Sequence, residues 1–185
     1  MPEELVVYCE ADGTPTGETA EKLQAHNSAT RLHLAFSCYV FNSEGKLLVT
    51  QRALTKKVYP GVWTNSLCGH PGPGEEIKNA IKRRLKFELG MEVTDFMLAL
   101  PNYTYKTPPF NGIIEHEFCP VYVSRSTNPV LPNTDEVEAY KWMMWQDFCN
   151  QALADRSDSW SWWCKDQIHQ MKTLPIIKQI TQESK

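Results

Sequence analysis

Residues 63–90, WTNSLCGHPGPGEEIKNAIKRRLKFELG, constrain the possible fold more than any other part of this chain. They predict a strand, a turn rich in glycine and proline, and an amphipathic helix that begins after Gly74 and ends at Gly90. Arg84 and Glu88 fall on the apolar stripe of that helix, so charged side chains face the inside of the fold. The apolar members of the stripe are Ile77, Ala80, Ile81 and Leu85.

Two interpretations of Glu88 fit this pattern. The first is an i,i+4 ion pair with Arg84 that only completes the helix, and at an exposed site it would stabilise by about 0.3 kcal/mol. The second is that Glu88 faces a metal ion at the mouth of the turn. Cys68 and His70 lie two residues apart there, so in an extended strand end they point to one side. Both interpretations stay open at this point.

The chain has 185 residues, 42% of them hydrophobic, and we expect a single domain over residues 1–185. A formal charge of −3 gives no global basic field, so we expect a small anionic ligand and neither nucleic acid nor a membrane as partner. The six cysteines form no CxxC pair, which is typical of reduced thiols. The N-terminus is acidic, and no segment approaches the ~20 apolar residues of a membrane span. We therefore expect a cytoplasmic location.

Short apolar runs between turn residues predict a sheet-rich chain whose helices gather near its end. A turn is expected at 14–17, before a short helical segment at 21–23, and the pattern becomes helical again from 145. A helix N-cap is expected near 157–159, and a last helix from about Pro175. This order predicts an α+β fold with a mixed sheet or sandwich. The expected strands are residues 5–9, 31–41, 46–52, 62–67, 91–100, 103–106, 113–123 and 139–144.

A second group of candidate residues surrounds the tripeptide 115–117. Glu115 and Glu117 share one face of a predicted strand, and such a pair alone more often lies at a solvent-exposed sheet edge than in a site. Three histidines strengthen the case for a metal, although none has the spacing of a local motif, so the set has to converge in space. Mixed imidazole and carboxylate ligands suit Mn²⁺, Zn²⁺ or Mg²⁺. The candidate ligands are His26, His33, His70, Glu115 and Glu117.

The helix also carries a known motif. Gly69, Glu75 and residues 83–91 follow the spacing G-x5-E-x7-R-E-U-x-E-E-x-G-U, so the chain resembles the Nudix family. Two of the glutamates with which Nudix pyrophosphohydrolases hold catalytic magnesium are Arg84 and Phe87 here, and only the last is kept. A hydrolase without those carboxylates would activate water poorly, whereas diphosphate binding can survive their loss.

Within that family, the chain resembles the type 1 isopentenyl-diphosphate isomerases over nearly its whole length. The blocks TRLHLAFSCYVFN, RALTKKVYPGVWTNSLCGHP and EHEFCPVY carry the resemblance with residues 135–137, and TNS-x-CGHP is its most specific part. The resemblance implies a Nudix-like mixed β-sheet sandwich flanked by helices. It also implies conversion of isopentenyl to dimethylallyl diphosphate in isoprenoid biosynthesis, by protonation and deprotonation through a tertiary carbocation.

The resemblance further implies roles for single residues. Cys68 and Glu117 match the catalytic acid/base pair, and Tyr105 lies beside Glu117 as a proton conduit. Glu88 and the Cys68 carbonyl match the site of a Mg²⁺ that arrives with the substrate diphosphate. One further divalent metal, Mn²⁺, Zn²⁺ or Mg²⁺, is implied at His26, His33, His70, Glu115 and Glu117. The positions that contact the diphosphate are Lys22, Arg52, Lys56 and Arg84.

The chain departs from the family at the aromatic residue that packs on the substrate hydrocarbon. The family has Phe-Thr/Ser-Pro there, and this chain has a tryptophan-rich run without proline. Aligning Trp160 with that Phe makes Trp163 the family tryptophan, whereas an ungapped count makes it Trp162. We prefer the first alignment.

Two rival functions come from other classes. A Nudix-type diphosphate hydrolase is the alternative enzyme, and the missing glutamates count against it. A non-catalytic metal-binding or interaction module would keep the histidines without needing Cys68 or Glu117. For the isomerase, the expected partner is a small-molecule substrate, isopentenyl diphosphate, and we expect a monomer.

Overall fold

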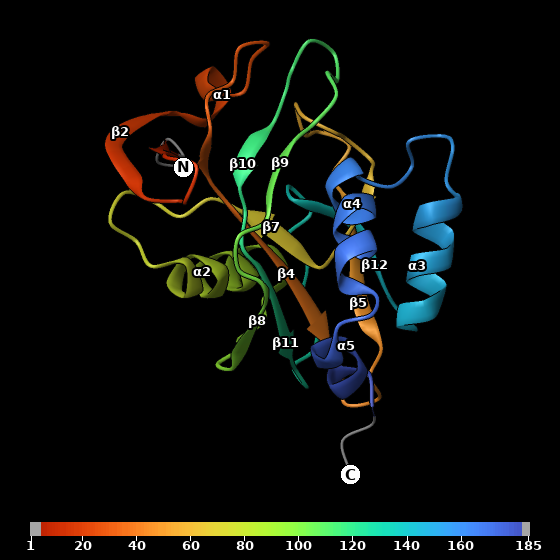
Figure 1. Cartoon of the computed structure of the whole chain (residues 1–185). Coiled ribbons are helices and arrows are strands. Elements are labelled where there is room, and N and C mark those ends of the chain that lie inside the picture. The colour runs from red at the N-terminus through yellow and green to blue at the C-terminus, as the bar shows by residue number, and fades with distance from the viewer. Residues whose placement is uncertain (1–4, 183–185) are drawn as a thin grey trace.

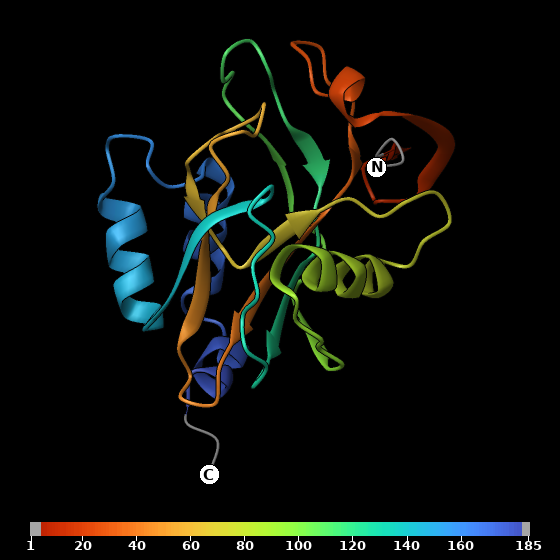
Figure 2. The ribbon, with the colours of Figure 1, turned by 180° about the vertical axis from the view of Figure 1, so that it is seen from behind.

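The computed structural model describes residues 5–182 and arranges them around two sheets, with α2 on one side of the larger sheet and α3, α4 and α5 on the other (Figure 1, Figure 2). The helices are α1 (Lys22–Ala25), α2 (Ile77–Leu89), α3 (Trp145–Ala154), α4 (Trp162–Met171) and α5 (Pro175–Ile180). Among the residues so described, no helix is long and apolar enough to cross a membrane.

The smaller sheet has the strand order β2-β1-β3-β10-β9. One edge of this sheet is the hairpin of β1 antiparallel to β2, and β3 pairs in parallel with β10. Its strands are β1 (Leu5–Cys9), β2 (Pro15–Glu21), β3 (His33–Leu34), β10 (His116–Phe118) and β9 (Thr104–Lys106).

The larger sheet follows the order β12-β5-β4-β11-β8, with β6 paired to β5 and β7 paired to β4. It is mixed, because β4 and β11 are parallel while β12 and β5 are antiparallel. Its strands are β4 (Phe36–Phe41), β5 (Leu47–Arg52), β6 (Trp63–Thr64), β7 (Leu67–Gly69), β8 (Phe96–Leu100), β11 (Val121–Arg125) and β12 (Val137–Met143).

The two sheets meet where two strand pairs pass from one sheet to the other. Between β3 and β4, the Ala35 amide donates to the Phe118 carbonyl at 2.9 Å. Between β10 and β11 lie Cys119 and Pro120, and proline has no amide hydrogen to give to a ladder. Since β3 is parallel to β10 and β4 is parallel to β11, both breaks fall at the same level. This corner positions the site described below.

Alternation along β4 builds a core on each face of the larger sheet. Phe36, Cys38 and Val40 pack with the apolar stripe of α2, whereas Tyr39 and Phe41 pack with α3, α4 and α5. All six residues of β4 are buried, as is typical of a central strand covered on both faces.

Helix α2 agrees closely with its prediction. It ends at Gly90, whose φ of 64° is a left-handed conformation that favours glycine. Arg84 is buried with Ala80, Ile81 and Leu85, as its position on the apolar stripe indicated.

Four predicted strands were wrong in extent. Residues 91–100 are strand only from Phe96 onward, and each of the other three is two strands. Residues 31–41 and 113–123 break at the corner between the sheets. Residues 62–67 break at Asn65 and Ser66, whose side chains take over ladder hydrogen bonds. The side-chain amide of Asn65 donates to the carbonyls of Cys38 and Leu67 at 3.1 and 2.8 Å. A side chain thus replaces a backbone donor, which apolar periodicity cannot reveal.

Two smaller predictions were also wrong. The turn expected at 14–17 is largely strand β2, whose residues are mostly exposed and therefore show no alternation. The N-cap expected near 157–159 is Ser161, whose hydroxyl accepts from the Cys164 amide. The Ser157 amide is instead held by the Asp155 carboxylate at 3.0 Å, a local hydrogen bond that competes with capping.

Candidate active site

The corner between the sheets brings together residues that are distant in sequence. Glu117 of β10 lies directly beside His33 of β3, and Cys68 of β7 lies directly beside Ser37 of β4. Because β3 runs on into β4, a carboxylate from one sheet and a thiol from the other lie along a single stretch of chain. Strand register thus assembles the acid/base candidates.

Three histidines and Glu117 form a buried cluster, which we call the imidazole cluster. One donor atom from each of His26, His33, His70 and Glu117 lies within 4.8 Å of all the others. The Nε2 atoms of His26 and His33 are 3.2 Å apart, and Oε1 of Glu117 is 3.0 Å from Nε2 of His70. Four donors at this spacing surround a point at which a divalent cation could sit.

The chemistry of these donors fits a metal. Nδ1 of His33 lies 2.9 Å from the Arg31 carbonyl, which fixes a proton on Nδ1. Nε2 is then the ring atom that faces the cluster, where it donates to Glu117 when protonated and can bind a cation when the ring is neutral. The lone pairs of neighbouring imidazoles repel unless a proton or a cation lies between them. Three imidazoles and one carboxylate suit a transition metal or zinc ion.

Burial sets the charge state of the imidazole cluster. It lowers the pKa of His26 to about 3 and also lowers the pKa of His70. Burial alone would raise the pKa of Glu117, but hydrogen bonds with His33 and His70 outweigh it and hold that pKa well below its usual value. Glu117 is therefore an ionised carboxylate among imidazoles, two of which are neutral.

Tyr105 joins the two glutamates predicted as ligands. Its hydroxyl donates to Glu117 Oε2 at 2.7 Å and to Glu115 Oε2 at 3.3 Å. Burial, and then the charge of Glu117, raise the pKa of Glu115 to about 7. Glu115 does not belong to the four-donor group, so its role as a metal ligand stays a prediction.

The thiol of Cys68 has a polar environment although it is largely surrounded by protein. Its Sγ donates to Asn65 Oδ1 at 3.1 Å and lies 3.3 Å from Ser37 Oγ. Burial raises the pKa of the thiol to about 12, against the opposing effect of these two hydrogen bonds. At neutral pH, Cys68 therefore holds its proton while Glu117 has lost its own.

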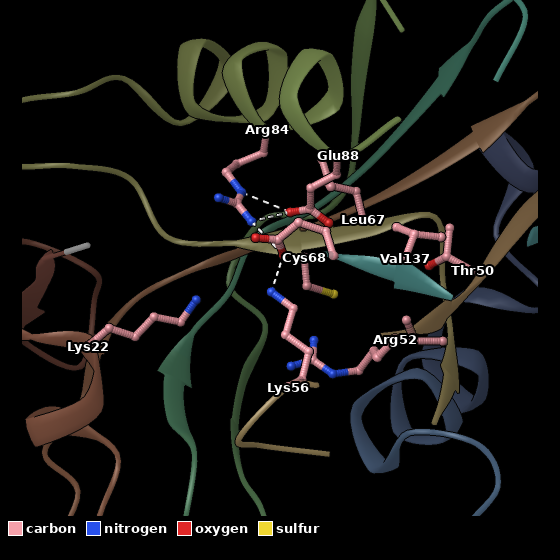
Figure 3. A pocket seen from close by; sticks show the side chains of 11 residues that line it. Lys22, Thr50, Arg52, Lys56, Leu67, Cys68, Arg84, Glu88 and Val137 are labelled. Atoms are coloured by element: carbon pink, nitrogen blue, oxygen red, sulfur yellow. Dashed lines mark hydrogen bonds and ion pairs between the residues drawn. The ribbon is translucent and has the colours of Figure 1, made fainter. Parts of the chain in front are cut away.

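Cys68 also lines a charged pocket, which we call the basic pocket (Figure 3). Helix α2 contributes Glu88 and one cation from above, and the other cations reach in from α1, β5 and the segment after it (Figure 3). The cationic residues of the pocket are Lys22, Arg52, Lys56 and Arg84. Four cations outnumber the carboxylates of Glu88 and Glu136, so the pocket suits an anion such as a diphosphate.

Glu88 and Glu136 hold two of these cations. Arg84 donates from Nε to Glu88 Oε1 at 2.8 Å and also pairs with Glu136 Oε2 at 3.3 Å. Lys56 makes a short contact with the same Glu136 oxygen. The predicted Arg84–Glu88 ion pair is thus confirmed, but it lies inside a pocket rather than on the surface. Burial raises the pKa of Glu88, an effect that Arg84 opposes.

Sequence reasoning gave Glu136 no role. It was noted only within residues 135–137, which carry part of the family resemblance. In the structure its side chain is 8% exposed and contacts two cations of the basic pocket. The usable signal was a carboxylate directly before a buried valine at the start of a strand, too weak to distinguish it from the neighbouring acidic residues.

The two tryptophans compared above have different surroundings. Trp162 is partly buried and stacks on Tyr105, with ring centroids 5.9 Å apart and planes at 29°. Trp163 is 3% exposed, and its indole donates to Thr64 Oγ1 at 2.9 Å. Trp162 therefore lies beside Tyr105, while Trp163 fastens α4 to β6.

The structure brings most of the predicted site residues together. Tyr105 and Glu115 adjoin the imidazole cluster, and Cys68 lines the basic pocket. Burial is the main cause of the raised pKa of Cys68, and the charge of Glu117 is close enough to raise it further. All four predicted diphosphate-binding cations line the basic pocket.

Comparison with known proteins identifies the family of this chain and similar enzymes. A family model described as the NUDIX domain matches residues 31–164. Isopentenyl-diphosphate Delta-isomerase of Salmonella heidelberg is 48% identical over 154 residues, covering 83% of this chain and 84% of that enzyme. The enzyme of the same description from Salmonella paratyphi C matches to the same degree.

Solved structures agree on the fold. The DR0079 protein of Deinococcus radiodurans has a TM-score of 0.70 at 16% identity, covering 91% of this chain and 99% of that one. A MutT protein from Methanosarcina mazei Go1 has a TM-score of 0.61 at 15% identity, covering 76% and 93%. At these identities the similarity concerns the fold alone.

Proposed function

The chain belongs to the NUDIX family and, within it, to the isopentenyl-diphosphate Delta-isomerases, and we propose that the corner between its two sheets is the active site. The protein interconverts isopentenyl and dimethylallyl diphosphate. That reaction adds a proton at C4 and removes one from C2, through a tertiary cation at C3. It needs two acid/base groups that hold one proton between them.

The observation that carries the proposal is the pairing of Cys68 with Glu117. A buried thiol with its pKa raised to about 12 and a carboxylate with its pKa held well below normal share one proton at neutral pH. One group gives its proton to the substrate and the other receives one, so each turnover leaves the proton on the opposite group. Tyr105, hydrogen-bonded to Glu117 at 2.7 Å, is the conduit we propose for returning it.

We assign the diphosphate to the basic pocket. Arg52, Lys56, Arg84 and Lys22 surround it, and guanidinium and ammonium groups bind phosphate oxygens through charge-assisted hydrogen bonds. A diphosphate held there leaves its hydrocarbon beside Cys68, which lines the same pocket. The orientation follows from charge, because only the diphosphate end of the substrate is anionic.

The alignment preferred above made Trp163 the tryptophan of the substrate hydrocarbon, but we assign Trp162 to it instead. Its ring stacks on Tyr105, which touches Glu117, whereas the Trp163 indole is engaged with Thr64. An indole face stabilises a carbocation without offering it a nucleophile. Aromatic walls also exclude water, which would trap the cation as an alcohol.

Divalent metals complete the proposal. The residues that would hold one ion are His26, His33, His70 and Glu117, with Glu115 beside them. Glu88 and the Cys68 carbonyl would hold a Mg²⁺ that enters with the diphosphate. When bound, such cations supply positive charge that fixes carboxylates and neutralises phosphate oxygens. The identity of the first ion, Mn²⁺, Zn²⁺ or Mg²⁺, is a matter for metal analysis.

The test is incubation with isopentenyl diphosphate and Mg²⁺, followed by measurement of acid-labile dimethylallyl product and of released phosphate. We expect allylic product without phosphate. Phosphate release would instead support a hydrolase, and no turnover by metal-loaded protein would support a binding module. Cys149→Ser, which alters a buried cysteine of α3 outside the site, is the matched control and should keep full activity.

Six unpaired thiols support the proposed cytoplasmic location.

A further inference from the structure

A line of buried polar side chains reaches the Cys68 sulfur from behind. The Tyr39 hydroxyl donates to Gln167 Oε1 at 2.7 Å, and Gln167 Nε2 donates to Ser37 Oγ at 2.9 Å. Ser37 Oγ lies 3.3 Å from Cys68 Sγ. Tyr39, Gln167 and Ser37 are each 0% exposed. We call these three residues the relay.

The direction of the last hydrogen bond follows from the neighbouring contacts. Both amide hydrogens of Asn65 are used on the carbonyls of Cys38 and Leu67, so Asn65 Oδ1 faces the thiol and accepts its hydrogen at 3.1 Å. A thiol has one hydrogen. The hydrogen between Ser37 and Cys68 must therefore come from the serine hydroxyl.

Every bond of the relay then points the same way, toward the sulfur. Ser37 accepts from Gln167 and donates to Cys68, while Asn65 accepts from Cys68 on the other side. The sulfur is held between one donor and one acceptor, and its side chain cannot rotate without losing both. Cys119 Sγ, at 3.5 Å, is the more distant of the two sulfurs near the serine.

We propose that Ser37 and Gln167 are positioning residues, which hold the Cys68 sulfur in its reactive orientation and link it to helix α4. The inference rests on the proposed function, because it assigns Cys68 to the reaction. Three polar side chains in an apolar core cost stability unless they are fully hydrogen-bonded. Helix α4 also carries Trp162, so the relay joins the element that faces the substrate to the thiol that reacts with it.

One variant is Gln167→Glu, which keeps the shape and removes the donor once the new side chain is ionised. Burial raises the pKa of such a carboxyl, so this variant is assayed toward alkaline pH, where the carboxylate accepts the Ser37 hydrogen and turns it away from Cys68 while Tyr39 can still donate to it. Ser37→Ala removes the same hydrogen by another route and introduces no buried charge, so it serves if Gln167→Glu fails to fold. The matched control is Ser124→Ala, which alters a fully buried serine of β11 whose hydroxyl donates to the Asp95 carbonyl.

We expect each relay variant to lower kcat by at least about tenfold, because a hydrogen bond to the reacting sulfur is lost, while KM stays within about twofold. The double variant should be no slower than the slower single variant, since both changes act through the same hydrogen. The Ser124→Ala control should lose stability with kcat unchanged. The rate at which a thiol-specific alkylator modifies Cys68 should change in the relay variants and not in the control.

Two results would overturn the proposal. One is a relay variant that lowers Tm but leaves both kcat and the alkylation rate unchanged, which would make the relay structural only. The other is a double variant whose losses of kcat multiply, because independent sites behave in that way. Failure of the wild-type protein to isomerise isopentenyl diphosphate would contradict the proposed function instead. The alkylation comparison would still report on the relay in that case.

Discussion

The imidazole cluster and the basic pocket are built in opposite ways, although Cys68 lines the pocket and the charge of Glu117 in the cluster affects its thiol. In the imidazole cluster, four protein donors already converge within 4.8 Å of one another. In the basic pocket, Arg84 is engaged with Glu88 and Glu136, and Lys56 with Glu136. The first region is ready for a cation, whereas the second has carboxylates in the places where an anionic ligand would bind.

The difference indicates which region retains its ligand between turnovers and which region binds its ligand anew in each turnover. A site made of fixed protein donors retains its metal through many turnovers. A pocket whose cations are neutralised by its own carboxylates stays folded when empty, and a diphosphate has to displace those contacts to bind. On the proposed metal role of Glu88, the same carboxylate would be released from Arg84 and free to hold a metal that arrives with the ligand, so the two interpretations of Glu88 would describe the pocket without and with its ligand.

Glu117→Gln should show the largest effect, because Glu117 belongs to the imidazole cluster and to the proposed acid/base pair. We expect turnover to fall by about a hundred- to ten-thousandfold. Metal analysis should show weaker binding of the tightly held ion, which loses a charged ligand. Cys68→Ser should lose turnover to a similar degree but keep its metal.

Metal content without and with a diphosphate ligand gives the corresponding control on the wild-type protein. About one tightly held ion should remain after desalting, and a second should appear only with the diphosphate. Two ions held equally tightly without ligand would contradict the contrast between the two regions.

Arg52→Ala should raise KM for isopentenyl diphosphate by about ten- to a hundredfold while kcat changes little. The guanidinium lines the basic pocket, and its Nε and Nη2 also donate to the Val58 carbonyl at 3.3 and 2.9 Å. Arg52→Lys keeps the charge without that bidentate contact, so its KM should lie between those of the wild type and Arg52→Ala. A lower kcat at unchanged KM would remove Arg52 from ground-state binding.

Glu136→Gln should have a smaller effect, measured as stability rather than turnover. Removing this buried charge leaves Lys56 and Arg84 with less compensation, at a cost of about 1–3 kcal/mol to the empty protein. Pyrophosphate should then raise Tm more in the variant than in the wild type, because it restores the missing negative charge. Glu75→Gln, which breaks the more exposed pair with Arg83, is the control and should change Tm little. Equal Tm gains in variant and wild type would show that Glu136 does not compete with the diphosphate.

The two regions were also unequally predictable from the sequence. Helical period identified the inward-facing Arg84 and Glu88, because a 13-residue helix repeats its pattern several times. The candidate imidazole ligands show no local spacing, so their grouping with Glu117 was a hypothesis about convergence in space, to which the family resemblance added support. Their convergence depends on the parallel pairing of β3 with β10, which is a contact between distant segments.

Three other misses have one physical origin. Apolar periodicity reports which way a side chain points, but it does not report which strand lies beside it. The break at Pro120, the side-chain hydrogen bonds of Asn65 and the contacts of Glu136 all depend on neighbours from other elements. The same limit explains why the surroundings of Trp162 and Trp163 could be distinguished only in three dimensions.

The most direct test of the Cys68–Glu117 pair is isomerisation in D₂O, with the position of deuterium in the dimethylallyl product read by NMR or mass spectrometry. The pair predicts that the wild-type protein delivers solvent deuterium to the new methyl group, and that Cys68→Ser and Glu117→Gln form almost no product of any isotopic composition. Product free of deuterium, or substantial isomerisation by Cys68→Ser, would contradict proton transfer by this pair.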